Sequence, residues 1–345
     1  MSIELAEKIK AEALRLGFTL AGITTPETPP HISTYQNWLD AGRHGSMAYL
    51  ENERARSHRN DPRLILPECQ SILLLAAPYP DPNTAPAKPE QGTGKIASYA
   101  WNDDYHLLLP EKMKAIVAFI EEDEGHSIPN RWYTDTGPIL ERDLAQRAGL
   151  GWIGKNTCLI NPQHGSYFFL AEILLGIELP SDEAINSDHC GTCTRCIEAC
   201  PTQAILPNRT LDANRCISYL TIENKGEIAE ELRPKIGAWI FGCDICQMIC
   251  PWNRFASPVT EAKIDPHPNL ITELDLTPQE FNKKFKNNPV KRAKRRGYLR
   301  NVAVALGNAG DPAAIPALKK ALNDIEPLVR DHARWALDRI KSKRE

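Results

Sequence analysis

The 345-residue sequence has no long hydrophobic run, and no apolar stretch approaches the roughly 18 residues that a membrane-spanning helix needs. Its first residues show no basic start, apolar centre and small-residue cleavage site of a secretory signal. We therefore expect a soluble protein of the reducing cytoplasm with no membrane partner. In that compartment the ten cysteines are not expected to form a disulfide framework.

Acidic residues are missing from one part of the chain. Residues 281–310 contain no Asp or Glu but nine Lys and Arg, which leaves a net charge of −12 for the rest. A basic cluster is most often a solvated surface, but an acidic body with one basic face is also suited to orienting a polyanion. Phe281, Phe285 and Tyr298 could stack on bases or could belong to the core. The candidate phosphate contacts are Lys291, Arg292, Lys294, Arg295, Arg296 and Arg300.

Seven of the ten cysteines are arranged in two runs of the bacterial ferredoxin type. The runs are Cys190-x2-Cys193-x2-Cys196-x3-Cys200-Pro201 and Cys243-x2-Cys246-x3-Cys250-Pro251. In such a run the first three thiolates hold one [4Fe–4S] cube, and the fourth, which precedes proline, reaches the other cube. Zinc sites usually show paired knuckles instead. The spacing predicts two iron–sulfur clusters, and the absence of Cys-x3-Cys-x2-Cys argues against a radical S-adenosylmethionine enzyme.

Two cubes need eight thiolates, but the second run has Ile240 where its leading cysteine would stand. The candidates for the eighth ligand are Cys69, Cys158 and Cys216, and we choose Cys216 because it lies between the two runs. One cube is assigned to Cys190, Cys193, Cys196 and Cys250, and the other to Cys200, Cys216, Cys243 and Cys246. Cys69 and Cys158 are expected to be small buried apolar residues.

The apolar patterns predict a multidomain protein of mixed α+β and α/β class. Residues 1–180 alternate strand-like and helix-like segments, which favours an α/β domain. Helices are expected at 3–16, 105–122 and 139–148, strands at 18–23, 71–77, 96–101 and 132–134, a hairpin over 157–161 and 166–175, and a long loop at 80–94. Residues 181–256 are expected to form a ferredoxin-like domain with little regular structure, because the metal sites organise it.

The last segment, 257–345, is expected to be helical. Residues 300–303, Arg-Asn-Val-Ala, recur thirty positions later as Arg-Asp-His-Ala, a pattern that resembles a HEAT-type repeat. Because such repeats bury little on their own, we expect this one to pack on the cluster domain and to hold the basic segment at the edge of the molecule.

Two further motifs lie between the α/β segments. Residues 149–154 match the dinucleotide pattern GxGxxG, but a helix is expected before it and a strand after it, which is the reverse of a Rossmann site. Asp135 follows a predicted strand in the segment Tyr-Thr-Asp-Thr-Gly-Pro, where a turn or helix cap is the ordinary role of an aspartate. Beside an apolar cofactor face its pKa would rise, and it could donate a proton near neutral pH.

Taken together, these features resemble the epoxyqueuosine reductase family. The resemblance rests on the cysteine runs with Cys216, on Asp-Thr-Gly-Pro and Gly-Leu-Gly-Trp-Ile-Gly-Lys-Asn within residues 133–156, on residues 215–223 and on the HEAT-like tail. It spans nearly the whole chain. It implies a cobalamin-dependent iron–sulfur oxidoreductase that reduces epoxyqueuosine to queuosine in the tRNA anticodon loop, the last step of queuosine synthesis.

The resemblance also implies roles for individual residues. The acid of the family falls on Asp135, and residues 1–180 would bind cobalamin. The candidate cobalamin contacts are Ser98, Asp135, Arg142, Lys155, Asn156 and Ser218. Because no Asp-x-His-x-x-Gly motif occurs, we expect no histidine ligand to cobalt. The basic segment would hold tRNA, and a low-potential donor of unknown identity would supply electrons to a monomeric enzyme.

Two other functions share part of this pattern. A corrinoid iron–sulfur reductase of a small molecule, such as a reductive dehalogenase, needs the clusters and cobalamin but not the basic segment. A non-catalytic electron-transfer subunit needs the clusters but not Asp135.

Overall fold

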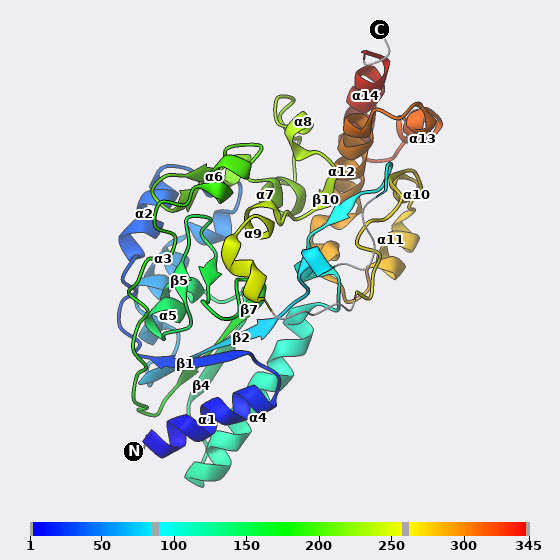
Figure 1. Ribbon diagram of the computed structural model, residues 1–345. Coiled ribbons are helices and arrows are strands. Elements are labelled where there is room, and N and C mark those ends of the chain that lie inside the picture. The colour runs from blue at the N-terminus through cyan, green and yellow to red at the C-terminus, as the bar shows by residue number, and fades with distance from the viewer. Residues whose placement is uncertain (1–2, 85–89, 257–261, 343–345) are drawn as a thin grey trace.

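The computed structural model describes residues 3–84, 90–256 and 262–342. A four-stranded sheet lies in its N-terminal part, in the order β1-β2-β7-β4 (Figure 1). The strands are β1 (Leu20–Thr24), β2 (Ser71–Pro78), β7 (Phe168–Leu175) and β4 (Asn130–Tyr133). β2 is buried along almost its whole length, which confirms the buried strand expected over 71–77.

The directions of these strands differ from the prediction. Every neighbouring pair is antiparallel, so the α/β arrangement predicted for this part is wrong and an α+β description applies. β2 and β4 do run in the same direction, with helix α4 (Tyr105–Glu124) between them in the sequence, as in a crossover unit. β7 nevertheless lies between them, antiparallel to both. The alternation of strands and helices does not reveal such an insertion, because it carries no information about spatial order.

Helices cover both faces of the sheet. Helix α1 (Ile3–Arg15) and α4 pack on one face, where Ile9, Ile116 and Ile173 share a buried cluster. Helix α5 (Glu141–Arg147) packs on the other face, where Leu144 and Leu174 share a second cluster. Successive residues of a strand point to opposite faces, so Glu172 of β7 lies on the α5 side.

Three predicted elements are shorter or differently paired. The strand expected over 96–101 is only β3 (Lys95–Ile96), followed by a 3-10 turn, and the helix expected over 139–148 is α5. In place of the hairpin, β6 (Leu159–Ile160) pairs with β5 (Trp152–Ile153). Both edges of β7 are occupied by β2 and β4, so none is left for β6. Of the loop expected at 80–94, residues 85–89 lie outside the described part of the chain.

The region of the cysteine runs contains only short elements, as predicted. They are α6 (Arg195–Ala199), β8 (Ile205–Leu206), β9 (Thr210–Leu211), α7 (Ile217–Ile222), α8 (Arg233–Ile236), β10 (Trp239–Phe241) and α9 (Ile245–Met248). β8 and β9 pair with each other, and β10 pairs in parallel with β3, which ties this region to the N-terminal part. The 3-10 turns of the chain are Ala48–Leu50, Pro62–Leu64, Pro82–Thr84, Ser98–Ala100, Ala213–Arg215, Pro251–Phe255, Pro289–Ala293 and Pro312–Ala314.

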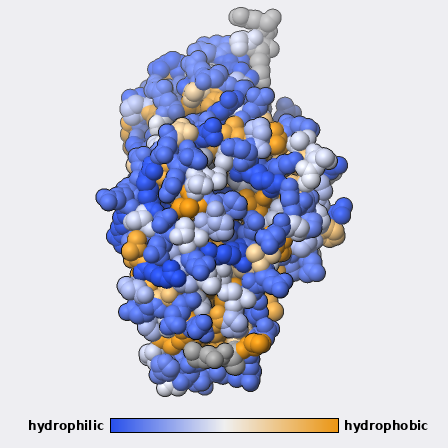
Figure 2. Space-filling model, turned by 90° about the vertical axis from the view of Figure 1, so that its left-hand side faces the viewer, coloured by the Kyte–Doolittle hydropathy of each residue, from blue (hydrophilic) through white to orange (hydrophobic). Residues whose placement is uncertain are grey.

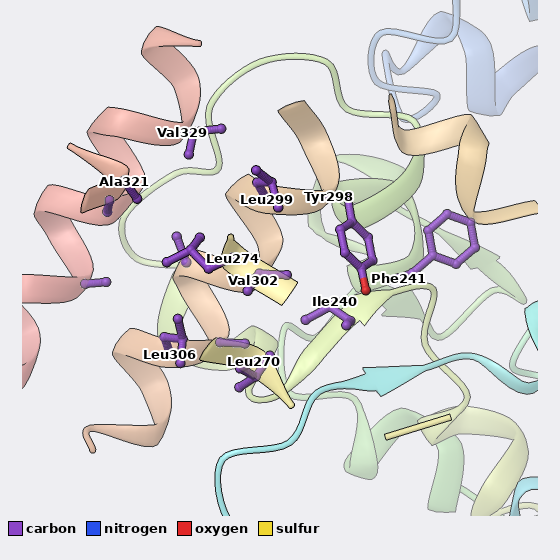
Figure 3. Close-up of a cluster of buried hydrophobic side chains, with 14 of the residues drawn as sticks. Ile240, Phe241, Leu270, Leu274, Tyr298, Leu299, Val302, Leu306, Ala321 and Val329 are labelled. Carbon is purple, nitrogen blue, oxygen red and sulfur yellow. The ribbon is translucent and has the colours of Figure 1, made fainter. Parts of the chain in front are cut away.

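The C-terminal part is helical, as predicted. It contains α10 (Leu270–Leu274), α11 (Pro278–Lys284), α12 (Lys294–Ala309), α13 (Ile315–Ala321) and α14 (Pro327–Ser342). Leu299 and Val302 of α12 share one buried cluster with Leu270 and with Ile240 and Phe241 of β10 (Figure 3). The expectation that the helical tail packs on the cysteine region is therefore confirmed.

The aromatic residues of the basic segment, residues 281–310, belong to this core. Phe281, Phe285 and Tyr298 are at most 2% exposed, and their ring centroids lie 5.1 to 5.7 Å apart. The Tyr298 hydroxyl also donates to Glu273 Oε2 at 2.8 Å. The base-stacking alternative is wrong, because these rings are closed off from solvent.

The face of the molecule shown in Figure 2 carries few large apolar patches, because most apolar side chains are buried in the interior. None of the helices within the described ranges is long and apolar enough to cross a bilayer. The face that carries α2 (Ile32–Asp40) and α3 (Glu53–Asn60) is mainly hydrophilic, and its apolar side chains form small separate patches (Figure 2).

Candidate functional site

The first group of cysteines surrounds a cavity of about 190 Å³. Its cysteines are Cys190, Cys193, Cys196 and Cys250, and Lys155 and Trp252 complete part of the wall. Three of these cysteines come from α6 and the loop before it, and the fourth lies two residues after the end of α9. The structure therefore brings together the four cysteines that the spacing assigns to the first cube.

The other four assigned cysteines form a second group, made of Cys200, Cys216, Cys243 and Cys246. Burial, followed by the charge of neighbouring thiols in this group, raises the pKa of Cys216 and of Cys243. Ala204 N donates to Cys200 Sγ at 3.3 Å, and the N–H groups of Ser218 and Tyr219 donate to Cys216. Such N–H···S bonds stabilise the thiolate, the form in which cysteine binds iron. The donor set fits a [4Fe–4S] cluster.

The two remaining cysteines differ from each other. Cys69 is buried, with Sγ 3.5 Å from Ser71 O, which confirms the expected packing role. Cys158 is half-buried, and its thiol contacts that of Cys246 and lies 3.4 Å from Gln247 Oε1. Cys158 therefore lies beside the second group, which its isolation in the sequence does not indicate.

Asp135 lies in the loop after β4 and is held by several contacts. Its φ of 60° is in the left-handed region that non-glycine residues rarely adopt. Its backbone N–H donates to Glu141 Oε1 at 2.5 Å, and the Tyr105 hydroxyl donates to its Oδ2 at 3.0 Å. His106 Nε2 lies 3.5 Å from the same oxygen, while 66% of the Asp135 side chain stays exposed. The carboxyl group is thus fixed in place but open on one side.

The charges around this carboxyl group determine where its proton lies. Burial opposes ionisation, but the nearby His106 and the hydrogen bond from Tyr105 outweigh it and lower the pKa of Asp135 below its ordinary value. Burial alone would also lower the pKa of His106, but the carboxylates of Asp104 and Asp135 raise it to about 9. The raised pKa of Asp135 that is expected beside a bound cofactor face stays a prediction. At neutral pH the proton resides on His106.

Sequence reasoning does not identify Tyr105 or His106 as site residues. The only signal is the Asp-x-His pattern of residues 104–106, which on its own suggests a cobalt ligand instead of a partner for an acid. In the structure Asp104 caps α4 by accepting the His106 N–H at 3.0 Å, so the first turn of the helix presents both side chains to Asp135.

Three of the predicted cofactor contacts lie at the second cysteine group. The buried Ser98 donates its N–H to Asp244 Oδ2 at 2.7 Å, and Asp244 lies between two cysteines of that group in the sequence. Asn156 Nδ2 donates to Cys246 O at 3.4 Å. Ser218, as described above, contributes an N–H to a thiol of the group.

The other two predicted contacts lie elsewhere. Arg142 extends from α5 to Thr157 O, to which it donates at 2.5 Å. The Lys155 ammonium donates to Gly191 O at 2.7 Å and to Cys193 O at 3.0 Å. Lys155 is therefore bound to the loop of the first cysteine group, and its predicted contact with cobalamin stays a prediction.

Aromatic and hydroxyl side chains lie between Asp135 and the second cysteine group. The ring of the buried Tyr99, next to Ser98, lies 6.4 Å from that of Tyr105, so residues near the thiols and near the acid are in contact. The buried Tyr167 hydroxyl is near Asp244 and has no hydrogen-bond partner within the described ranges. A buried hydroxyl needs a polar partner, and the amide groups at the rim of a corrinoid would supply one. The residues present fit this cofactor.

The basic segment borders the same site. Arg292 forms a double contact with Glu223, at 2.7 and 3.1 Å, and its charge is among those that lower the pKa of Asp135. Lys225, which sequence reasoning misses because it lies outside this segment, donates to Arg292 O at 3.3 Å. Three other predicted basic residues remain accessible, namely the exposed Lys291 and Lys294 and the half-buried Arg296.

Two predicted tRNA contacts are corrected by the structure. Arg300 is fully buried, and its guanidinium donates to Leu220 O at 2.6 Å and to the carbonyls of Asn224 and Gly226. It is not available to a phosphate. Arg295 is only 16% exposed and is bound to Asp324 at 2.6 Å, so it belongs to an internal ion pair.

Comparison with known families agrees with this arrangement. Residues 59–136 match the model described as Epoxyqueuosine reductase QueG, DUF1730. Residues 189–253 match the 4Fe-4S double cluster binding domain, and residues 299–324 match the PBS lyase HEAT-like repeat. The predictions of two [4Fe–4S] clusters and of a HEAT-like repeat are confirmed.

Individual relatives cover nearly the whole chain. An epoxyqueuosine reductase of Pseudomonas aeruginosa is 41% identical over 97% of this chain and 94% of its own length. That of Escherichia coli is 39% identical over 97% of this chain and 89% of its own. A crystal structure of epoxyqueuosine reductase with a tRNA-Tyr epoxyqueuosine-modified stem loop superposes with a TM-score of 0.88, at 33% identity, over 98% and 90% of the two chains. One from Bacillus subtilis, with its catalytic loop swung out of the active site, gives 0.87 at 32% identity over the same shares.

Proposed function

The chain belongs to the epoxyqueuosine reductase family, and from this membership we propose that it reduces epoxyqueuosine to queuosine in the anticodon loop of tRNA. The observation that carries the proposal is the position of Asp135. The charge of Arg292, in the basic segment, acts on this residue, and aromatic contacts connect its surroundings to the second cysteine group. A proton donor, a polyanion-binding surface and an electron path thus meet at one site.

The cofactors are two [4Fe–4S] clusters and cobalamin. We assign the clusters to the two cysteine groups, with the second group on the side of Asp135. Cobalamin, when bound, supplies a cobalt centre that collects single electrons and reacts with carbon. Ser98, Asn156 and Ser218 would hold it near the second group, and Arg142 would lie at its edge.

The reaction needs a proton as well as electrons. An epoxide, two electrons and one proton give an alkene and a hydroxide ion. We assign delivery of that proton to Asp135, and its storage to His106, which is charged below about pH 9 and lies 3.5 Å from Asp135 Oδ2. Without this transfer the departing oxygen would leave as an alkoxide. A placed acid contributes roughly 10²–10⁴-fold to the rate.

We assign tRNA binding to Lys291, Arg292, Lys294 and Arg296, the accessible members of the basic segment, together with Lys225. Phosphate contacts of this kind fix the position of a nucleic acid, while recognition of the modified base falls to the site around Asp135.

We further propose a division into a cobalamin-binding domain at 1–180, a cluster domain at 181–256 and a HEAT-like domain at 257–345, in which residues 257–261 lie outside the described ranges. The enzyme would act as a monomer in the cytoplasm. A low-potential donor would deliver electrons at the first cysteine group, which borders an open cavity.

Replacement of Asp135 by Asn tests the assignment. With clusters and cobalamin loaded anaerobically, we expect the variant to keep the absorbance bands of both cofactors and to lose roughly 10²–10⁴-fold in single-turnover reduction of an epoxyqueuosine-containing stem loop. Reduction at the wild-type rate would remove the proposed role of Asp135. A wild-type protein that binds no corrinoid and turns over no epoxide would instead support a non-catalytic electron-transfer subunit.

A further inference from the structure

Two glutamates lie beneath the Asp135 loop. Glu172, in the middle of β7, is 0% exposed, and neither of its carboxyl oxygens meets a hydrogen-bond donor in the parts of the chain that the structure describes. Its neighbours in the sheet are Leu74 of β2 and Tyr133 of β4. Its carboxyl group instead interacts with that of Glu141, the first residue of α5. Two acidic groups thus face each other in the interior.

Both carboxyl groups cannot be ionised together in this setting. Burial, followed by the charge of Glu141, raises the pKa of Glu172 well above its ordinary value. Burial and the charge of Asp135 also raise the pKa of Glu141. Adjacent buried carboxyl groups resolve this conflict by sharing one proton. The shared proton makes Glu172 a donor and leaves Glu141 free to accept.

Glu141 uses its accepting capacity on the loop. Its Oε1 receives the backbone N–H of Asp135 at 2.5 Å, the residue whose φ of 60° is unfavourable for an aspartate. The charged groups that act on Glu141 are Asp135 from the loop, Arg142 from α5 and Glu172 from β7. The side chain of Arg142 extends away to Thr157. Glu172 is therefore the group that can hold the Glu141 carboxylate, by donating a hydrogen bond to it from β7.

We propose that Glu141 and Glu172 are positioning residues that share one proton and thereby hold the Asp135 loop in its left-handed conformation. The inference rests on the proposed function, because the position of the loop matters through the proton that Asp135 delivers. Glu172 anchors Glu141, and Glu141 anchors the backbone of Asp135. A fully ionised pair would separate by charge repulsion and release the loop.

The shared proton has a direct spectroscopic signature. A protonated carboxyl group in the interior absorbs as a carbonyl, apart from ionised carboxylates, and shifts on exchange into deuterium oxide. We expect this band at neutral pH in the infrared spectrum of the cluster-containing protein without substrate. Glu172→Gln should remove the part of the band that comes from the glutamate pair, whereas Asp135→Asn should keep it. Absence of the band from the wild-type protein would overturn the shared proton.

Hydrogen exchange tests the anchoring of the loop. Glu141→Ala and Glu172→Leu should speed exchange within residues 134–140, while Glu172→Gln, whose amide donates to Glu141 without a shared proton, should exchange as the wild type does. Glu121→Ala is the matched control, since Glu121 Oε1 accepts the Ile128 N–H at 3.1 Å in another loop of the same domain. It should speed exchange near residue 128 alone.

Kinetics separate this inference from the proposed function. Glu141→Ala should lower kcat by about 10- to 100-fold with little change in KM, because a misplaced acid slows chemistry more than binding. Unchanged loop exchange in both Glu141→Ala and Glu172→Leu would overturn the anchoring. If instead the exchange and infrared results hold while Asp135→Asn keeps full activity, the anchoring stands and the assigned role of Asp135 fails.

Discussion

The contact between Asp135 and His106 places a cation 3.5 Å from the carboxyl group that faces the open side of the site. This contact has opposite effects on its two members. It lowers the pKa of Asp135 and, with Asp104, raises the pKa of His106 to about 9. In the proposed reaction an acid that is ionised at rest needs a local source of protons, and we assign that role to His106.

Replacement of His106 by Asn should therefore change the pH profile as well as the rate. In the wild type, single-turnover reduction by prereduced enzyme should fall as pH rises through about 9, because His106 then loses its proton. The variant should be slower at neutral pH and should lack this alkaline limb. If both proteins showed the same alkaline limb in their pH–rate profiles, the titration would belong to a group other than His106.

The same histidine affects stability in a defined direction. Its pKa of about 9 in the folded protein exceeds the ordinary 6.5. The stabilisation from its charged form is therefore complete below about pH 6.5 and is lost as pH rises to about 9. Denaturant titrations at pH 6 and pH 9.5 should show a smaller difference in unfolding free energy for His106→Asn than for the wild type.

At the residue scale, the sequence predicts those site residues whose signal is local. The spacing of Cys190 to Cys200 reports a ligand set directly, because a cluster loop needs those separations. Glu172 gives no such signal. In the sequence it interrupts an apolar strand, and only the packing of α5 shows that it meets Glu141. Arg300 likewise belongs to a basic run in the sequence, and only the structure shows that its side chain is buried and bound to backbone carbonyls.

At the scale of elements, α12 is fastened to the cysteine region by polar contacts as well as by its core. The buried guanidinium of Arg300 donates to the carbonyls of Leu220, Asn224 and Gly226, which lie in and directly after α7. Because α7 follows Cys216, these contacts connect the helical tail to a proposed cluster ligand. The repeat pattern predicts that α12 packs against a neighbour but not which atoms it binds.

Replacement of Arg300 by Met tests these contacts. The variant leaves buried carbonyl groups without a donor, so we expect the free energy of unfolding to fall by roughly 3 kcal/mol. Arg296→Met, one turn earlier on the same helix and only half-buried, should stay within about 0.5 kcal/mol of the wild type. The measurement is anaerobic denaturant unfolding followed by circular dichroism. Equal stability of the two variants would show that the Arg300 contacts contribute no net stabilisation.

At the scale of the whole molecule, charge is divided between an acidic body and one basic segment. Residues 281–310 carry nine basic side chains, and the rest of the chain has a net charge of −12. Of the nine, Arg295 and Arg300 are bound inside the fold and are not accessible to a ligand. Lys291, Arg292, Lys294 and Arg296 lie at the start of α12 and in the turn before it, far from α1 (Figure 1), and the charge of Arg292 acts on Asp135. A nucleic acid attracted to these four residues would therefore be brought toward Asp135, the proposed acid.

Charge reversal of Lys291, Lys294 and Arg296 together tests this arrangement. Each lost phosphate contact lowers the slope of log affinity against log salt by about 0.7–0.9, so we expect the slope for a tRNA stem loop to fall by about 2–3 and binding to weaken most at low salt. The control reverses Lys8, Arg15 and Lys114 on α1 and α4, which adds the same net charge at the other end of the molecule and should leave the slope unchanged. Equal losses in both triple variants would mean that total charge, not this segment, attracts the tRNA.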